Sequence, residues 1–389
     1  MNRIYLDCAA TTPLREEVAA VMRAHASGAG AYNASSLHAQ GRAARAILDD
    51  ARATVARLIG AGAREIVFTS SGTEANNFAL LGAARARRVR GAHIITAATE
   101  HLSVLRTLDA LRAEGYELTI LPVDGDGRID PASFARAITS QTILASFMLA
   151  NNEIGTLHPI AELAALAREP DIVMHADAVS AVGHLPIDVR ALGVDLLSFA
   201  AHKFYGPKGA AGVYVREGTE IAPQLLGGAQ EGGLRAGTED VVGIAGLAAA
   251  LAISLRELPE TALREQQLRD CFESGVKAAF PAVRVNGAGA PRLPMISSIS
   301  FPNVESATLL ARLDLEGIAA SAGSACASGT AKASHVIDAL GAPRWARDGV
   351  VRFSLGRTTT EDDIEDVLKR LPGIVESVRG SAVPAEVWS

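Results

Sequence analysis

Residues 196–215 read LLSFAAHKFYGPKGAAGVYV, and their pattern indicates the fold of a large part of the chain. An apolar run ends at His202 and Lys203, a glycine-rich turn follows, and the chain returns to an apolar run. Short apolar runs bounded by Gly and Pro are typical of buried β-strands. We therefore expect two strands joined by a turn, with two basic side chains where the first strand ends.

The same alternation extends outward over residues 65–215. The strand-like runs are 65–70, 93–98, 118–123, 143–150, 172–178, 196–201 and 212–216. Between them, residues 73–91 and 160–170 carry apolar side chains at helical spacing, with charges on the other face. This pattern predicts an α/β fold, in which helices cover a mostly parallel sheet of seven strands. Such sheets bind ligands at the carboxyl ends of their strands.

The composition changes after residue 255, which predicts a second unit. Residues 254–280 are charged helical sequence, residues 292–301 and 349–356 have strand-like patterns, and a helix with an acidic first turn begins near Thr360. We expect a large domain over residues 13–255 and a smaller α+β domain over residues 256–389.

Charge and hydropathy limit the kinds of partner. The 389 residues are 49% hydrophobic with a formal net charge of −6, so no basic excess favours nucleic acid or a membrane surface. The longest apolar stretch, residues 241–255, is short and rich in Ala and Gly, and residues 1–13 contain no apolar signal core. We expect a cytoplasmic protein without a membrane span, which binds a small molecule or a protein.

The cysteines, Cys8, Cys271 and Cys326, show no paired-ligand spacing such as C-x-x-C. An odd number without that spacing argues against a disulfide framework and against a thiolate metal site. We therefore expect free thiols and no metal, with Cys8 and Cys271 packed in the interior.

Lys203 is the best candidate for amine chemistry. An amine beside an apolar strand and a Gly/Pro turn can be partly desolvated, which lowers its pKa toward the neutral form that makes Schiff bases. The alternative is an ordinary strand-end lysine with its charged head in water. Lys208, in the same turn, is a competing candidate.

Other strand ends carry further polar groups. Asp177 could keep a pyridine nitrogen protonated, because a close opposite charge shifts a pKa by roughly 1–3 units. Residues 68–77, FTSSGTEANN, would present backbone N–H groups and the Thr73 hydroxyl to a phosphate at a helix N-terminus. His101 and Asn152 follow two more strands, where His101 could stack on a cofactor ring and shuttle protons.

Each of these groups also has an ordinary explanation. Asp177 could cap a turn or helix, Thr73 could be a helix N-cap with Asn76 at the third helical position, and His101 could be structural. Five strand ends of one sheet, however, each carry a group that a pyridoxal-phosphate site needs. Their convergence favours such a site.

Together these segments resemble the cysteine desulfurases of the NifS and IscS type, within the class V aminotransferase-like pyridoxal-phosphate enzymes. The resemblance runs almost end to end. In the family's order, the matching motifs are YLDCAATTP (5–13), NASSLHAQGR (33–42), TSSGTEANN (69–77), TEH (99–101), NNEIG (151–155), HADAV (175–179), AHKFYGPKG (201–209), GGAQEGGLRAGTED (227–240), SAGSACASG (321–329) and VRFSLGRTTTEDD (351–363). It implies fold type I of the pyridoxal-phosphate-dependent transferases, with residues 1–12 placed against the small domain.

The resemblance also implies a role for each candidate. Lys203 carries the cofactor as a Schiff base, His101 stacks on the ring, Asp177 pairs with the ring nitrogen, Asn152 lies near the ring oxygen and the substrate, and Gly72, Thr73 and His202 hold the phosphate. Thr238 reaches the phosphate of the partner subunit, which implies a homodimer. Arg352 binds the substrate carboxylate, a task suited to a guanidinium, and Asn33 assists it.

Cys326 distinguishes between activities of this group. It lies in residues 321–334, SAGSACASGTAKAS, a run of small residues that predicts an exposed, mobile loop. The resemblance implies that L-cysteine binds at the cofactor and that the Cys326 thiolate takes its sulfur, which gives a persulfide and L-alanine. The sulfur would pass to an acceptor protein, for iron–sulfur clusters or another sulfur pathway. The alternatives are a selenocysteine lyase, another class V enzyme such as an aminotransferase, and a non-catalytic sulfur-pathway subunit.

Three positions depart from the family's pattern. Ser180 occupies a cofactor-binding position where the family usually has Gln, and Ala200 stands where it usually has Ser, three residues before Lys203. The sequence YNASS, residues 32–36, lacks the Gly and Pro of the family's turn. These changes bear on cofactor affinity and substrate preference, and none removes a group needed for bond-making.

Overall fold

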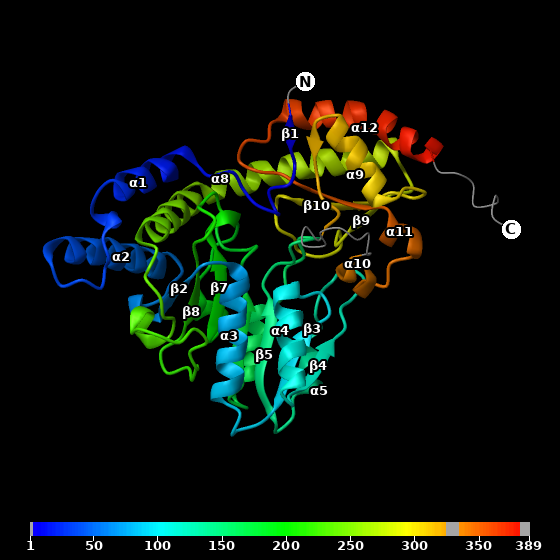
Figure 1. Cartoon of the computed structure of the whole chain (residues 1–389). Coiled ribbons are helices and arrows are strands. Elements are labelled where there is room, and N and C mark those ends of the chain that lie inside the picture. Colours follow the sequence, from blue (N-terminus) through cyan, green and yellow to red (C-terminus); the bar gives the residue numbers. More distant parts are fainter. Residues whose placement is uncertain (1–2, 324–333, 382–389) are drawn as a thin grey trace.

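The computed structural model of the chain describes residues 3–323 and 334–381. Figure 1 shows a large sheet with its helices and, beside it, a smaller group of helices and strands that includes the final helix. One long helix, α8 (Val241–Ala279), runs along both parts.

In the described part of the chain, the large sheet has seven strands in the order β2-β8-β7-β6-β5-β3-β4. They are β2 (Ile66–Thr69), β3 (His93–Ala97), β4 (Glu117–Leu121), β5 (Thr142–Met148), β6 (Val173–Asp177), β7 (Leu196–Ala200) and β8 (Ala211–Val215). Strand β8 is antiparallel to both of its neighbours, whereas all other neighbouring pairs are parallel. The prediction of a mostly parallel seven-stranded α/β sheet is confirmed.

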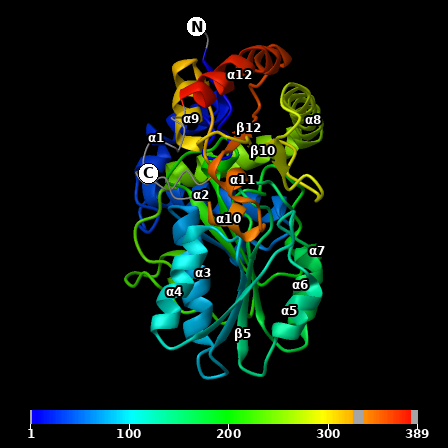
Figure 2. The same ribbon diagram turned by 90° about the vertical axis from the view of Figure 1, so that its right-hand side faces the viewer.

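Helices cover both faces of this sheet, as Figure 2 shows. Helices α3 (Gly72–Ala86) and α4 (Leu102–Ala113) lie on one side, and α5 (Pro131–Ala137), α6 (Ile160–Arg168) and α7 (Val189–Leu192) lie on the other. Strands β5, β6 and β7 are therefore buried at every residue, which explains their continuous apolar sequence. The edge strand β4 leaves Glu117 and Ile120 exposed.

The smaller unit is built on an antiparallel sheet of order β12-β10-β9. Its elements are β9 (Arg284–Asn286), β10 (Ile296–Ser300), α9 (Ser306–Leu315), β11 (Ile318–Ala319), α10 (His335–Ala339), α11 (Arg344–Asp348), β12 (Val350–Ser354) and α12 (Glu361–Ser381). The N-terminal strand β1 (Ile4–Tyr5) pairs in parallel with β11, so the first residues of the chain do contact this unit. Strands β10 and β12 occur where sequence patterning placed them, while the short β9 was missed.

Helix α8 joins the two units. It contacts α1 (Glu16–Ala26) and α2 (Ala39–Leu58) on the large unit and α12 on the small one. The helix continues through residue 255 without a break, so no linker separates the chain at the domain boundary that we expected there. The division into two domains stays a prediction. Short 3-10 turns complete the fold: η1 (Ala29–Ala31), η2 (Ala63–Glu65), η3 (Ala201–Lys203) and η4 (Gln230–Gly233).

Helix α8 is also long and apolar enough, by length and composition, to cross a membrane. The mean hydropathy of its most apolar 18-residue window is 1.8. The apolar stretch of residues 241–255 is therefore part of a longer helix, which continues to Ala279. Half of that window is buried inside the fold, as is usual for the core helix of a folded domain.

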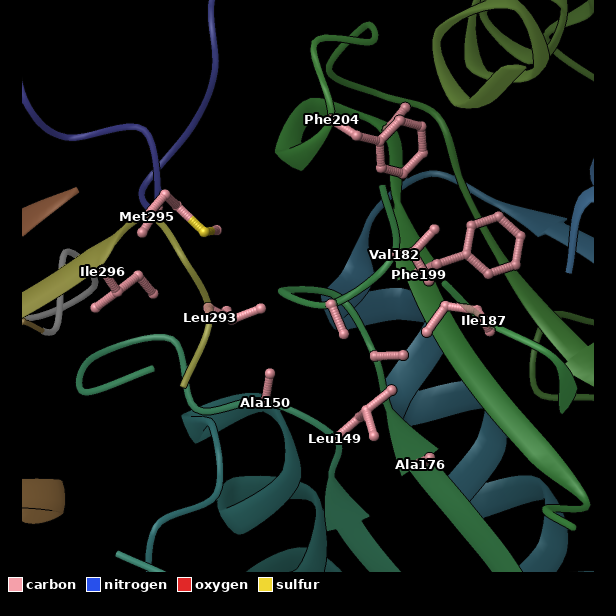
Figure 3. Close-up of a cluster of buried hydrophobic side chains, with 14 of the residues drawn as sticks. Leu149, Ala150, Ala176, Val182, Ile187, Phe199, Phe204, Leu293, Met295 and Ile296 are labelled. Carbon is pink, nitrogen blue, oxygen red and sulfur yellow. The ribbon is translucent and has the colours of Figure 1, made fainter. Parts of the chain in front are cut away.

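A continuous hydrophobic core joins the two units (Figure 3). Leu293, from the small unit, points toward Leu149 and Ala150, which follow β5, and Ile296 lies farther along the same segment. All four side chains are less than one-tenth exposed. Main-chain hydrogen bonds reinforce the contact, since Leu293 N donates to Gly155 O at 2.8 Å. The carboxyl edge of the sheet is thus held against the small unit.

Glu265 of α8 is a buried acid beside Arg264. It is 1% exposed, and its Oε1 has no hydrogen-bond partner within the described ranges. Burial raises its pKa to about 8, against a value near 4.3 in an unfolded chain. The folded state therefore holds this proton more tightly than the unfolded state.

We predict that Glu265→Gln stabilises the protein, with an effect that is small below about pH 4 and grows up to about pH 8. Because the folded-state pKa is raised, the wild-type protein loses stability as the pH rises through this window, and the glutamine variant does not. Urea unfolding across the window measures the effect, with the exposed Glu260→Gln on the same helix as control. If the free energies of unfolding of Glu265→Gln and the wild type changed in parallel with pH, the prediction would be contradicted.

Candidate active site

A cavity of about 200 Å³ opens at the carboxyl edge of the large sheet. The strand ends of β6 and β7, the starts of α3 and α4, residues 9–10 and strand β12 all contribute to its wall. It brings together nine of the predicted site residues: Gly72, Thr73, His101, Asn152, Asp177, Ser180, His202, Lys203 and Arg352. This placement agrees with the rule that parallel sheets bind ligands at their carboxyl edge.

Three predicted residues are not placed in this cavity. Cys326 lies outside the described residues. Asn33 is exposed, and its Oδ1 accepts a hydrogen bond from Ser35 N at 2.8 Å. Thr238 is exposed as well and lines a smaller pocket with Arg235. Their roles stay predictions, and the role expected of Thr238 involves a second subunit.

The amine of Lys203 is held by the N-terminal segment. Its Nζ donates to the carbonyl oxygens of Ala9 and Ala10 at 2.5 and 3.0 Å. Thr12 fixes the same turn, because its N and Oγ1 each donate to His202 O at 2.9 Å. The sequence pattern indicates the lysine, but it does not indicate these contacts with the N-terminal segment, because the two segments are about 190 residues apart in the chain.

Asp177 ends strand β6 and is 5% exposed. Its Oδ1 accepts from Val179 N at 3.0 Å, an ordinary turn contact, and its Oδ2 accepts from Asn76 Nδ2 at 2.7 Å. Beneath it, burial lowers the pKa of His175 to about 4, so this ring is neutral at pH 7. The carboxylate is therefore oriented by two donors and also lines the cavity.

His101 is the N-cap of α4. Its Nδ1 accepts from Ser103 N at 3.0 Å and lies 2.7 Å from Ser103 Oγ. Burial lowers its pKa, and the nearby Lys203 acts in the same direction. The explanation as a structural histidine is thus partly correct, but the ring also lines the cavity.

Helix α3 begins two residues earlier than a Thr73 cap would require. Its N-cap is Ser71, whose Oγ accepts from Glu74 N at 3.1 Å, while Glu74 Oε2 accepts from Ser70 N at 2.8 Å. The assignment of Thr73 as N-cap with Asn76 at the third position is therefore wrong. Thr73 stays available to the cavity, and a Cβ on Gly72 would lie only 2.8 Å from Val179. The start of α3, with Gly72 and Thr73, therefore suits a phosphate at a helix N-terminus.

Arg352 is among the largest fully buried side chains of residues 3–323 and 334–381. Its Nη1 donates to Asn152 O at 2.7 Å and its Nη2 to Asp7 Oδ1 at 2.8 Å. Its Nε has no partner among residues 3–323 and 334–381. Arg352 also lines the cavity, where its guanidinium could bind an anionic ligand. Asp7 was not predicted as a site residue, since only the fold brings it to β12.

Sequence analysis missed three more ionisable groups: Glu153 and His335, which line the cavity, and Glu100, which precedes His101 in the chain. Glu153 is buried, burial raises its pKa, and its Oε2 accepts from Ser334 Oγ at 2.5 Å. His335 donates from Nε2 to the carbonyl oxygen of Glu100 at 2.9 Å. The Glu100 carboxyl is fully buried, which raises its pKa well above the usual range. No groups of three or more His, Cys, Asp or Glu side chains in the described ranges could hold a metal.

The two described cysteines differ in environment. Cys8 is buried against Gly356 and Tyr205, and burial raises the pKa of its thiol to about 12. The prediction that Cys8 serves packing is confirmed. For Cys271 it is wrong, because the buried face of this part of α8 is formed by Leu268 and Phe272, which leaves Cys271 exposed.

Comparison with known proteins identifies the family of this chain. Residues 4–367 match the family described as aminotransferase class-V. The chain belongs to this family. Within this class V group, it is 45% identical over 387 residues to the cysteine desulfurase IscS of Dictyoglomus turgidum, covering 100% of this chain and 98% of that one. It is 43% identical over 376 residues to the cysteine desulfurase IscS of Methanosarcina thermophila, covering 97% and 93%.

Solved structures of class V relatives share the fold. A NifS-like protein matches with a TM-score of 0.90 and 34% identity, covering 97% of this chain and 100% of that chain. SspA in complex with cysteine matches with a TM-score of 0.81 and 32% identity, covering 91% and 99%. Both likenesses extend over more than nine-tenths of this chain.

We predict that Ellman's reagent labels Cys271 rapidly in the native protein and leaves Cys8 unlabelled until the chain unfolds. The reason is exposure, and a thiol with a pKa of about 12 also stays protonated at mildly alkaline pH. Two double variants isolate the thiols, Cys326→Ala with Cys271→Ala and Cys326→Ala with Cys8→Ala. Equal labelling rates of the two native proteins would contradict the assignment.

Proposed function

We propose that this chain is a pyridoxal-phosphate-dependent cysteine desulfurase, which converts L-cysteine to L-alanine and passes the sulfur to Cys326 and then to an acceptor. One observation carries the proposal: a single cavity joins the Lys203 amine, the Asp177 carboxylate, the His101 ring and the Arg352 guanidinium. The names of its class V relatives support the same activity.

The residues of the cavity fit pyridoxal phosphate. Lys203 Nζ would bind the cofactor, Asp177 would face its ring nitrogen and His101 its ring, with Asn152 and Ser180 near the ring oxygen. The first turn of α3 with Gly72 and Thr73, together with His202, would hold the phosphate. When bound, the cofactor withdraws electrons from the α-carbon of an amino acid.

Arg352 would bind the substrate carboxylate. Asp7 and the carbonyl of Asn152 hold two of its nitrogens in place, so the guanidinium is oriented before substrate arrives. Arg352 lines the cavity, and a guanidinium can pair with a carboxylate through parallel N–H donors. Recognition of the carboxylate at this end would turn the rest of an amino acid toward Lys203.

The position of Cys326 in the chain supports its role in sulfur transfer. Gly323 and His335, which flank the segment containing it, both line the cavity. Cys326 is three residues from Gly323, and three residues can span up to about 10 Å. A thiol attached at that distance can be delivered to a substrate in the cavity. The thiolate would bond to the substrate sulfur as the substrate Cβ–S bond breaks. The electron pair of that bond stays with the substrate, which gains a proton to become L-alanine, and the sulfur remains on Cys326 as a persulfide.

A homodimer is part of this proposal. Arg45 connects the segments that carry Asn33 and Thr238, because its Nε donates to Ala34 O and its Nη2 lies 3.2 Å from Glu239 Oε1. Each of these segments also exposes a large apolar side chain, Leu37 at 91% beside Asn33 and Leu226 at 80% in the loop that leads to Thr238. Exposed apolar side chains of this size are typical of a subunit interface, across which Asn33 and Thr238 would reach the other cavity.

The remaining expectations stay proposals. We place residues 13–255 in the cofactor-binding domain and residues 256–389, with 1–12, in the small domain. The protein would act in the cytoplasm on L-cysteine and deliver sulfur to an acceptor protein, as in iron–sulfur cluster assembly. We expect no nucleic-acid or membrane partner.

We predict that the purified protein forms alanine from L-cysteine and absorbs near about 420 nm through its bound cofactor. Lys203→Ala abolishes both the band and the activity, because no amine is left to bind the cofactor. Cys326→Ala keeps the band and loses about a hundredfold or more of the alanine formation, because it lacks the nucleophile. Cys271→Ala is the matched control and keeps full activity. Undiminished turnover in Cys326→Ala would refute sulfur transfer to this residue.

We also predict that Leu226→Asp weakens the dimer and lowers alanine formation, because it places a charge in the apolar interface. Light scattering coupled to size-exclusion chromatography measures the mass. Leu315→Asp, at a site 72% exposed on α9, is the control that stays dimeric. A fully active wild-type monomer would rule out the dimer proposal.

A further inference from the structure

A chain of four hydrogen-bonded side chains links His101 to Asp177 through two residues that the proposed function does not use. Asn76 of α3 donates from Nδ2 to Asp177 Oδ2 at 2.7 Å and to Ser103 Oγ at 2.9 Å. Ser103 Oγ in turn lies 2.7 Å from His101 Nδ1. Asn76 is 1% exposed and Ser103 is 8% exposed, so bulk water competes little for these bonds.

The direction of each bond follows from the available hydrogens. The Nδ2 group of Asn76 has two hydrogens, and its two contacts use both of them. Turning the amide over would place its oxygen against the Asp177 carboxylate, so this orientation is the favourable one. Because Ser103 Oγ accepts from Asn76, its own hydrogen is available for His101.

These donors fix the tautomer of His101. The main-chain N–H of Ser103 can only donate, and it lies 3.0 Å from His101 Nδ1. Together with the Ser103 hydroxyl, it directs two donors at Nδ1. The neutral ring must therefore carry its proton on Nε2. Protonation at Nδ1 would set one N–H against another and displace Ser103.

The charged groups around His101 act in both directions. Asp177 on β6 favours the protonated ring, whereas Lys203 on η3 and His335 on α10 disfavour it. Burial is the largest influence and lowers the pKa. The two donors at Nδ1 oppose protonation there, so they act in the same direction as burial.

We propose that Asn76 and Ser103 are positioning residues, which hold His101 as its Nε2–H tautomer and orient the Asp177 carboxylate through one shared amide. Asp177 then has one donor on each oxygen, Val179 N on Oδ1 and Asn76 on Oδ2. His101 offers the cavity a donor at Nε2 and keeps Nδ1 engaged. The effect on catalysis rests on the proposed function, but the tautomer does not.

Nitrogen NMR of protein labelled in its histidines tests the tautomer directly. The His101 signals are assigned by their absence in His101→Gln. We expect the chemical shift of an unprotonated nitrogen at Nδ1 and of a protonated one at Nε2. In Ser103→Ala, which lacks one donor to Nδ1, the pH midpoint of His101 rises by about half to one unit. Ser103→Thr keeps the hydroxyl and restores the wild-type midpoint.

Kinetics of the holoenzyme test the shared amide. Asn76→Ala is expected to lower kcat/KM for alanine formation by about tenfold to a hundredfold, because a bond to a charged group is lost. The control is Asn77→Ala, which removes the neighbouring amide that donates to Thr73 O at 2.9 Å. It should stay within about twofold of wild type, with pH profile and KM unchanged.

A wild-type His101 with its proton on Nδ1 would overturn the proposal, as would an unchanged midpoint in Ser103→Ala. If Ser103→Ala does not fold, Asn76→Ala gives the same test, because without Asn76 the hydroxyl of Ser103 no longer has a fixed direction. A protein that forms no alanine yet has the Nε2–H tautomer would refute the desulfurase assignment and support this network.

Discussion

The convergence of parallel strand ends is the constraint on which this site depends. Strands β5, β6 and β7 run side by side in one direction, so whatever follows each of them arrives at the same edge of the sheet. Asp177 and Lys203 are thereby brought to one cavity although they belong to different strands. Helices on both faces exclude water from these strands. Only a few polar groups therefore lie at the strand ends, and they are well oriented.

The small unit completes the cavity. Its strand β12 supplies Arg352, and the N-terminal segment that pairs with β11 supplies Ala9 and Ala10. Asp7, in the same segment, accepts a hydrogen bond from Arg352. A continuous apolar core, which includes Leu293 and Leu149, holds the two units together (Figure 3). The carboxylate-binding arginine and the cofactor-binding lysine that we propose are therefore set at a fixed separation by packing between units, which favours a preorganised site.

Much of this arrangement could be predicted from the sequence, because it follows from local patterns. Continuous apolar runs such as residues 143–150 indicated the buried strands, and polar residues after them indicated Asp177, His101 and Lys203. The contacts of Asn76 and Asp7 could not be predicted, since they depend on the packing of α3 against β6 and of the N-terminus against β12. The exposure of Cys271 was missed because it depends on which face of α8 is buried.

The central claim is that the amine of Lys203, placed in one cavity with Asp177, binds the cofactor. Borohydride reduction of the holoenzyme followed by peptide mass mapping tests it most directly, because reduction fixes the cofactor to the amine that holds it. We expect a phosphopyridoxyl group on Lys203 and none on Lys208, five residues further along the same turn. A label on Lys208, or on any lysine outside the cavity, would contradict it.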